Sequence, residues 1–243
     1  MIKFFRKIRY NLMSENKNGK YIKYAIGEIF LVVIGILIAL QINNWNEGRK
    51  ALKSELNSLI SLKQEFEHNK SLLRRRQNQR VNIVGPNKAF NKLLSSGKFT
   101  YEDILKGTRK LFWSTSNPSY GVLNSLIASG EINLIKPDSL KFRISNWKDF
   151  LVDFLEDEKQ ISDRAGKYND IMITKFPFRN WGDYQEAEVK EIYLEVAHQI
   201  EYRNRFYEYL NVLNFVIDTY PPVENELDSI IHLIDMRITE LEK

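Results

Sequence analysis

Residues 29–40 form an unbroken apolar run, and polar residues return on both sides of it. With its flanks the run covers about 19 residues, about 28 Å as an α-helix, which matches the thickness of a bilayer core. Glu28 lies at its edge, where a cost of at most about 3 kcal/mol is outweighed by about −3 to −6 kcal/mol from the large apolar side chains. The pattern therefore predicts a transmembrane helix over residues 24–42.

Two alternatives explain the apolar run less well. A buried helix of a soluble domain leaves unexplained the basic segment before the run and the aromatic residues at its ends. A cleaved signal peptide needs small residues at a cleavage site, whereas Gln41, Asn43 and Asn44 follow the run. We expect an uncleaved signal anchor.

Lys and Arg residues are concentrated before the span and predict its orientation. Residues 1–23 hold seven Lys or Arg and one Glu, a net charge of +6, so residues 24–243 sum to −1 of the total +5. Because basic residues flank spans on the cytoplasmic side, the N-terminus is expected in the cytoplasm and the large domain outside. A nearly neutral domain lacks the basic surface that DNA or RNA binding requires, so we expect no nucleic-acid partner.

The residues around the span are of the types that anchor helices in a bilayer. Glu28 is expected to extend towards Lys23 or lipid headgroups rather than to serve as a proton or ion site. Gly35 and Ala39 form a pair of small residues that permits close association of two helices. The expected membrane-anchoring residues are Lys20, Tyr21, Lys23, Tyr24, Glu28 and Trp45.

Two sequence blocks resemble a known family. The block KYAIGEIFLVVIGILIALQINNWNE, residues 23–47, is similar to the N-terminus of an uncharacterised family of membrane proteins from Gram-negative Bacteroidota. The looser block SYGVLNSLIASGEINLIKPDSLKFRISNW, residues 119–147, resembles the middle region of that family. The resemblance implies an anchor in the inner (cytoplasmic) membrane with a periplasmic helical domain, and the family has no assigned activity to transfer. With the charge distribution it predicts a basic cytoplasmic leader (1–23), the span (24–42) and a periplasmic helical domain (43–243).

Apolar residues at spacings of three and four predict helices throughout the external domain. The first continues from the span to Gly85-Pro86, and the charges of Lys63 and Lys70 in its apolar seam favour packing against its own domain over a coiled-coil stalk. The further helices are expected at about 87–96, 101–112, 120–129, 138–175 and 184–219, and from Pro221-Pro222 to about 241. No alternating pattern indicates a strand. The predicted fold class is all-α, with an antiparallel helical bundle-like external domain.

Two Glu-x-x-His pairs are the strongest indication of metal chemistry, since di-iron bundles use this motif. They are Glu65 with His68 and Glu195 with His198. With Phe66 at the centre of its apolar face, Glu65 lies about 100° and His68 about 160° away, so both are expected to point outwards. The second pair stands off by the same angles from a face that runs from Val189 through Ile200 and Tyr207 to Leu210. We expect no metal site.

Two groups of charges and one group of aromatic residues have simpler structural explanations. The cations Arg74, Arg75, Arg76 and Arg80 are expected to form a solvated helix face, with anion, headgroup or acidic-partner binding as the alternative. The acidic run Asp153, Glu156, Asp157 and Glu158 is expected to pair with these cations or to bind a cation weakly. Core packing, rather than an apolar ligand pocket, is expected for Trp113, Tyr120, Trp147, Phe150, Phe176, Phe178, Trp181 and Tyr184.

The chain contains no cysteine, and no GxSxG, Walker, dinucleotide-binding or HExxH motif occurs. We therefore expect no enzymatic activity, catalytic residue or cofactor. Our hypothesis is a membrane-anchored periplasmic interaction or scaffold protein, whose process is unknown and whose partners are the lipid bilayer and either envelope proteins or a second copy. The alternative is a small-ligand binding or sensing module of the cell envelope.

Overall fold

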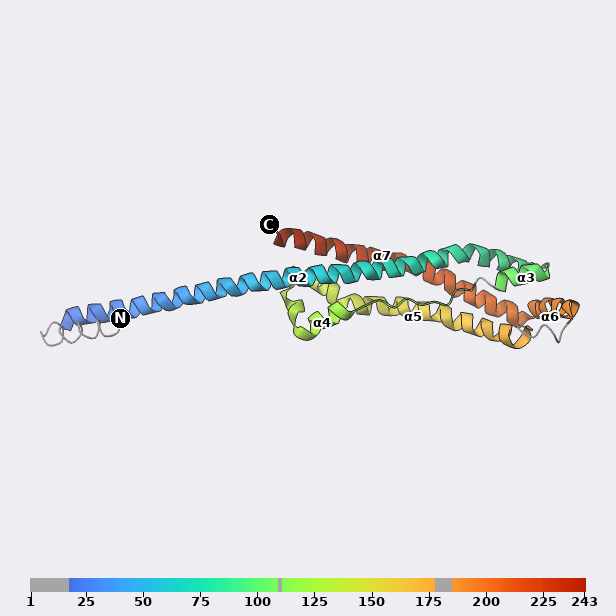
Figure 1. Cartoon of the computed structure of the whole chain (residues 1–243), viewed down its shortest axis with the longest axis horizontal. Helices are drawn as coiled ribbons and strands as arrows, with labels where there is room; N and C mark the ends of the chain where they lie inside the picture. The colour runs from blue at the N-terminus through green and yellow to red at the C-terminus, as the bar shows by residue number, and fades with distance from the viewer. Residues whose placement is uncertain (1–17, 109–110, 178–184) are drawn as a thin grey trace. The chain divides into compact units, whose positions relative to one another are not determined.

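The computed structural model describes residues 18–108, 111–177 and 185–243, and it is helical with no strand in these ranges. The leader residues 1–17 lie outside the described residues. The chain divides into two compact units, Met1–Ser54 and Glu55–Lys243. Figure 1 labels the elements.

The first helix among the described residues, α2, covers Asn18–Ser96 and contains Pro86. The prediction that Gly85-Pro86 ends this helix was therefore wrong, and residues 87–96 belong to α2. A proline inside a helix removes one hydrogen bond, here the one to the carbonyl of Asn82. Asn82 is exposed, so water can bind that carbonyl and the break in hydrogen bonding stays local. The helix ends before Gly97, whose φ of 66° lies in the left-handed region that favours glycine.

Three short elements follow, which are α3 (Tyr101–Thr108), α4 (Gly121–Ser129) and the 3₁₀ turn η1 (Glu131–Leu134). At the start of α3, Asp103 accepts hydrogen bonds from the backbone N–H and the hydroxyl of Thr100, both at 2.9 Å. The Asp103 N–H donates in return to the Thr100 hydroxyl at 3.2 Å, which completes a reciprocal N-terminal cap. Gly130, with φ of 78°, ends α4.

The C-terminal half of the chain consists of α5 (Asp138–Lys175), α6 (Glu186–His198) and α7 (Ile200–Leu241). The prediction for α5 is confirmed. The helix predicted over 184–219 is divided at Gln199, whose ψ of 137° is extended. Arg203 holds this break by donating to the last-turn carbonyl of Ala197 at 3.1 Å. The predicted break at Pro221-Pro222 was wrong, because α7 continues through both prolines.

In the second unit α5 packs against α7, and α2 lies beside both (Figure 1). Three ion pairs join α2 to α7, and the residue number on α7 decreases as the residue number on α2 increases. These two helices therefore run in opposite directions. The pairs are Lys63–Asp235, Lys70–Asp228 and Arg74–Glu224. In contrast, α2 and α5 run in the same direction. Their pairs are Phe66–Trp147 and Arg80–Glu158.

One hydrophobic core joins these helices, and its largest apolar members are fully buried. They are Trp147, Tyr168, Tyr202, Tyr209, Phe66 and Phe206. In the first unit the apolar residues of the predicted span are instead exposed along the whole run. The structure thus separates a helix segment without apolar partners from a domain that encloses its own core.

Residues 111–120 connect α3 to α4 without helical structure and depend on side chains of the long helices for hydrogen bonds. The Phe112 N–H donates to the Tyr209 hydroxyl at 2.8 Å, and the Ser116 N–H donates to Glu158 at 2.6 Å. The Ser119 N–H donates to Asn69 at 2.7 Å. Buried polar side chains therefore stabilise this segment, because an unpaired backbone N–H would cost free energy when buried.

Candidate functional site

Three of the expected membrane-anchoring residues have described side chains, and all three lie in the first unit. Lys23 is exposed, Glu28 is half-buried, and Trp45 is 67 % exposed with the Arg49 guanidinium 5.3 Å from its ring centre. The side chains of Lys20, Tyr21 and Tyr24 lie outside the described residues. The described apolar helix is long enough to cross a membrane by length and composition. It is the only such helix in the described part of the chain.

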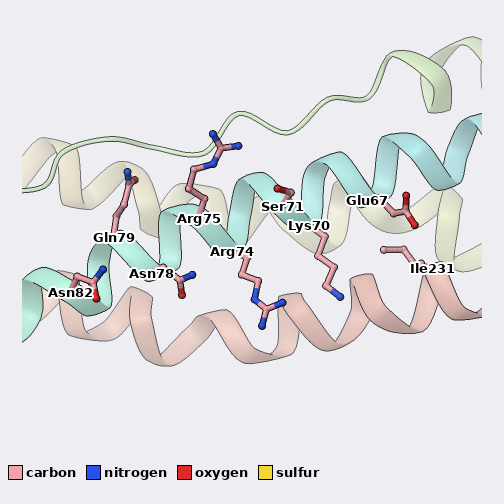
Figure 2. Close-up of a pocket in the computed structure, with 9 residues that line it drawn as sticks. All are labelled: Glu67, Lys70, Ser71, Arg74, Arg75, Asn78, Gln79, Asn82 and Ile231. Atoms are coloured by element: carbon pink, nitrogen blue, oxygen red, sulfur yellow. The ribbon is translucent and has the colours of Figure 1, made fainter.

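A groove of about 580 Å³ runs along α2 beside α7 in the second unit. Figure 2 shows its polar lining, which projects from successive turns of α2. The lining residues are Glu67, Lys70, Ser71, Arg74, Arg75, Asn78, Gln79, Asn82 and Ile231. Because this lining is polar and the groove is open along the helix, it suits a charged or hydrogen-bonding partner better than an apolar ligand.

Cations of α2 bridge the edge of this groove to carboxylates of α7. Lys63 lies 2.6 Å from Asp235, and the hydrogen bond to this carboxylate raises the pKa of Lys63. Lys70 pairs with Asp228, and Arg74 lies 3.5 Å from Glu224. The lysines that interrupt the apolar seam of α2 thus have partners on α7.

Arg75 differs from these cations. Its side chain is exposed and forms no ion pair or hydrogen bond with another described residue. Figure 2 shows Lys70 and Arg74 directed towards α7 and Arg75 directed away from it. Arg75 is therefore the cation of this groove that is available to a partner.

Arg80 corrects the expected solvated face of four arginines. Its side chain is fully buried and pairs with Glu158, which is also fully buried. Burial lowers the pKa of Arg80, and the Glu158 carboxylate opposes this shift. Glu158 further accepts from the Ser116 N–H at 2.6 Å and the Ser116 hydroxyl at 2.7 Å. The predicted pairing between the acidic run and the arginines is confirmed for Arg80 and Glu158. The helical pattern, however, had predicted that Arg80 lies on the surface.

The other carboxylates of α5 lie on its solvent side. Asp149, Asp153 and Glu156 lie within about 60° of each other around α5, opposite Glu158. All three are exposed and form no ion pair within the described residues. Asp163 and Asp170 continue this row on either side of the exposed Lys167. We call these five residues the α5 acidic stripe. Burial and the nearby carboxylates of Asp153 and Glu156 raise the pKa of Asp157 at its margin.

Glu65 is buried, contrary to the expectation that both Glu-x-x-His pairs point outwards. Its carboxylate accepts from the N–H groups of Val122 at 2.8 Å and Leu123 at 3.1 Å, at the start of α4. A carboxylate at a helix N-terminus satisfies unpaired N–H groups, so this residue caps α4. The buried face of α2 is therefore wider than the face that its apolar residues define, and it includes Glu65.

The other members of these two pairs are exposed, which are His68, Glu195 and His198. His198 lies against Phe99, with ring centres 4.5 Å apart, and its Nδ1 is 2.7 Å from the Leu194 carbonyl. No group of three or more His, Asp or Glu among the described residues is placed to hold a metal ion.

The aromatic group is divided by the structure. Trp147 and Phe176 are buried in the core, as expected, and Tyr120 is half-buried. Trp113 and Phe150 are exposed, contrary to the expected core packing. Phe178, Trp181 and Tyr184 lie outside the described residues. Sequence reasoning failed for Trp113 because this residue lies in a non-helical segment that has no periodicity.

The fold defines an all-helical protein with one long apolar N-terminal helix. The chain belongs to the Family of unknown function (DUF6090), whose model matches residues 28–193, more than half of the chain. The match begins in the apolar helix and ends in α6. No curated protein and no solved structure matches the chain.

Proposed function

We propose that this protein is a non-enzymatic interaction protein that one helix anchors in the inner membrane. Residues 1–23 lie in the cytoplasm, and the helical domain stands in the periplasm as a bundle that docks onto envelope proteins or a second copy of the chain. The lipid bilayer is the first partner of this arrangement.

The observation that carries the proposal is the exposure of the apolar run in the first unit. Ten Ile, Leu, Val and Phe side chains between residues 29 and 40 are each 37–65 % exposed, on every side of the helix. Fully burying one such side chain gains about 1.5–3 kcal/mol relative to exposing it to water. A helix that is apolar all round needs apolar surroundings, and lipid supplies them.

The roles of the buried carboxylates support a binding function without catalysis. Glu55 accepts two hydrogen bonds from Arg237, at 2.8 and 2.9 Å, and one from the Lys136 N–H at 2.8 Å. Glu65 caps α4, and Glu158 pairs with Arg80 and accepts two hydrogen bonds from Ser116. Each of these buried carboxylates is thus bound by groups of the fold, whereas a catalytic acid or base must reach a substrate.

The membrane placement is tested by extraction and by labelling. The chain lacks cysteine, so Ser14→Cys and Asn225→Cys each introduce a unique thiol. In a Gram-negative host we expect the chain to stay in the membrane after alkaline carbonate treatment. A membrane-impermeant maleimide should label the thiol at position 225 in spheroplasts, and the thiol at position 14 only after lysis. Extraction by carbonate, or labelling at position 14 before lysis, would contradict the proposal.

The groove beside α7 supports the second candidate, a small-ligand binding or sensing module. Its volume is in the range of ligand sites, and its free cation, Arg75, suits an anion. A ligand that binds only the native state raises its melting temperature. A thermal-shift series with inorganic phosphate and small dicarboxylates, with Arg75→Gln as the control, tests this candidate. Equal shifts in both proteins would argue against the groove.

A further inference from the structure

The solvent faces of α2 and α5 carry opposite charges that the fold leaves unused. On α2 the exposed guanidinium of Arg75 has no partner among the described residues. On α5 the acidic stripe presents its carboxylates directly away from the core. Isolated surface charges gain most from opposite charges on another molecule.

The two charged faces lie at the same level of the domain. The ring centres of Phe66 and Trp147 are 5.8 Å apart, and Arg80 pairs with Glu158 further along the same two helices. Arg75 lies between the α2 members of these two contacts, and Asp153 lies between their α5 members. Because α2 and α5 run in the same direction, Arg75 and Asp153 stand at matching heights.

We propose that two copies of this chain dock side by side, with Arg75 of one copy against the α5 acidic stripe of the next. This inference rests on the proposed membrane anchor, which confines all copies to one membrane and lets their helical domains meet side by side. Within each domain Arg75 lies level with Asp153, so parallel copies bring Arg75 of one against Asp149, Asp153 and Glu156 of the next. Polar side chains beside Arg75, those of Ser71 and Asn78, supply hydrogen bonds to the same carboxylates.

The contact is heterologous, since the α2 face and the α5 face are different surfaces that point away from a shared core. Such contacts build closed rings or open rows rather than a two-fold dimer. Exposed ion pairs each contribute at most about 1 kcal/mol, so the contact is weak between free domains. Anchoring in one membrane raises the effective concentration of the partner, so a weak contact is enough to hold two copies together.

Cysteine pairs in full-length chains test the contact, because the native chain has no thiol. Two differently tagged copies are co-expressed, one with Ser71→Cys and the other with Val152→Cys, both exposed positions at the proposed level. We expect crosslinking between the two tags in native membranes. The control replaces Val152→Cys by Ser139→Cys, which lies about 20 Å lower on α5 and should crosslink poorly. Equal crosslinking of Ser71→Cys with itself would overturn the heterologous contact.

Charge reversal identifies the residues. We expect Arg75→Glu to lower the Ser71–Val152 crosslink about fivefold or more, and Asp153→Arg in the same chain to restore much of it. Lys92→Glu also reverses a positive charge but lies about 26 Å further along α2, so it should leave the crosslinking yield unaltered. Circular dichroism shows whether each variant is folded, and Asp153→Arg alone repeats the loss with an independent substitution.

The outcomes separate the two proposals. A chain released from membranes by carbonate contradicts the anchor itself. A chain that stays in the membrane and gives no crosslink between copies, or a crosslink that is insensitive to Arg75→Glu, overturns only the lateral contact. Crosslinking of Ser71→Cys to a different protein in place of a second copy also overturns it.

Discussion

Gln77 on α2 donates a hydrogen bond of 2.9 Å to the backbone carbonyl of Ile217 on α7. In a regular helix this carbonyl would accept from the N–H four residues later, at position 221. Pro221 has no N–H, so a side chain from a neighbouring helix replaces the missing donor. This contact explains how α7 continues through two prolines that by local rules should end it.

We expect Gln77→Ala to lower the free energy of unfolding by about 1–2 kcal/mol, because it leaves the Ile217 carbonyl without a donor in a partly buried site. In a Pro221→Ala background the restored backbone N–H supplies that donor, and Gln77→Ala should cost clearly less. Thermal unfolding of the full chain in detergent, followed by circular dichroism, measures the coupling between the two substitutions.

The matched control is Pro222→Ala. Because Pro222 has no N–H, the carbonyl of Asp218 lacks its helical donor. Asp218 is exposed, and the hydrogen bond from Gln77 goes to Ile217 instead. The cost of Gln77→Ala should therefore stay the same with and without Pro222→Ala. If Gln77→Ala also costs the same unfolding free energy in the Pro221→Ala background, the Gln77 side chain does not replace the missing N–H of residue 221.

The second prediction concerns the buried Arg80–Glu158 pair. Arg80→Met removes one partner and leaves the Glu158 carboxylate buried, so we expect a loss of about 3–5 kcal/mol in unfolding free energy. Combining it with Glu158→Gln should recover part of this loss, since no buried charge is left. Urea unfolding measures both. Arg74→Met, which removes an exposed pair, should cost at most about 1 kcal/mol.

The third prediction concerns the contact of α3 with α2. A Cβ atom at Gly107 would lie 2.3 Å from the ring of Phe90. We expect Gly107→Ala to destabilise the domain by about 1–3 kcal/mol through overpacking, and Phe90→Leu in the same chain to relieve part of the clash. Gly166→Ala is the control, because nothing lies within 4 Å of a Cβ there and alanine favours a helix. Melting temperatures should move in opposite directions for the two glycines.

The fourth prediction concerns the pH dependence of the α3 cap. Hydrogen bonds from the backbone and the side chain of Thr100 lower the pKa of Asp103 below its usual 3.8. A lowered pKa in the folded state means that the cap contributes fully above pH 3.8 and loses its contribution as pH falls through the folded-state pKa. Asp103→Asn should therefore lower the melting temperature at pH 7 by more than at pH 3. A pH-independent difference would contradict the role of the carboxylate.

Features with a local physical cause were predictable from the sequence. The long apolar N-terminal helix was predictable without reference to any other element, because a continuous run of apolar residues defines it. The bounds of α5 were equally predictable, since a regular apolar spacing begins at Asp138 and stops at Lys175. The family match covers the apolar run and α5.

Features that depend on a distant partner were not predictable. Glu65 and Arg80 have side chains that usually face water, and only the N–H groups of α4 and the carboxylate of Glu158 make their burial favourable. Because Gln199 is extended, the buried face of α7 does not continue the helical periodicity of α6. Ile200, placed on the buried face by one continuous helix, is therefore 76 % exposed.

By itself, the sequence determined the helical class, the long apolar N-terminal helix with the basic residues before it, and the absence of thiol chemistry. All of these follow from residue types and their local spacing. The tertiary structure decided which polar residues are buried, where helices end, and which charges are left without partners on the surface. These outcomes depend on groups far apart in the chain, because a buried charge, a proline or an unpaired carbonyl is tolerated only where another helix brings the complementary group.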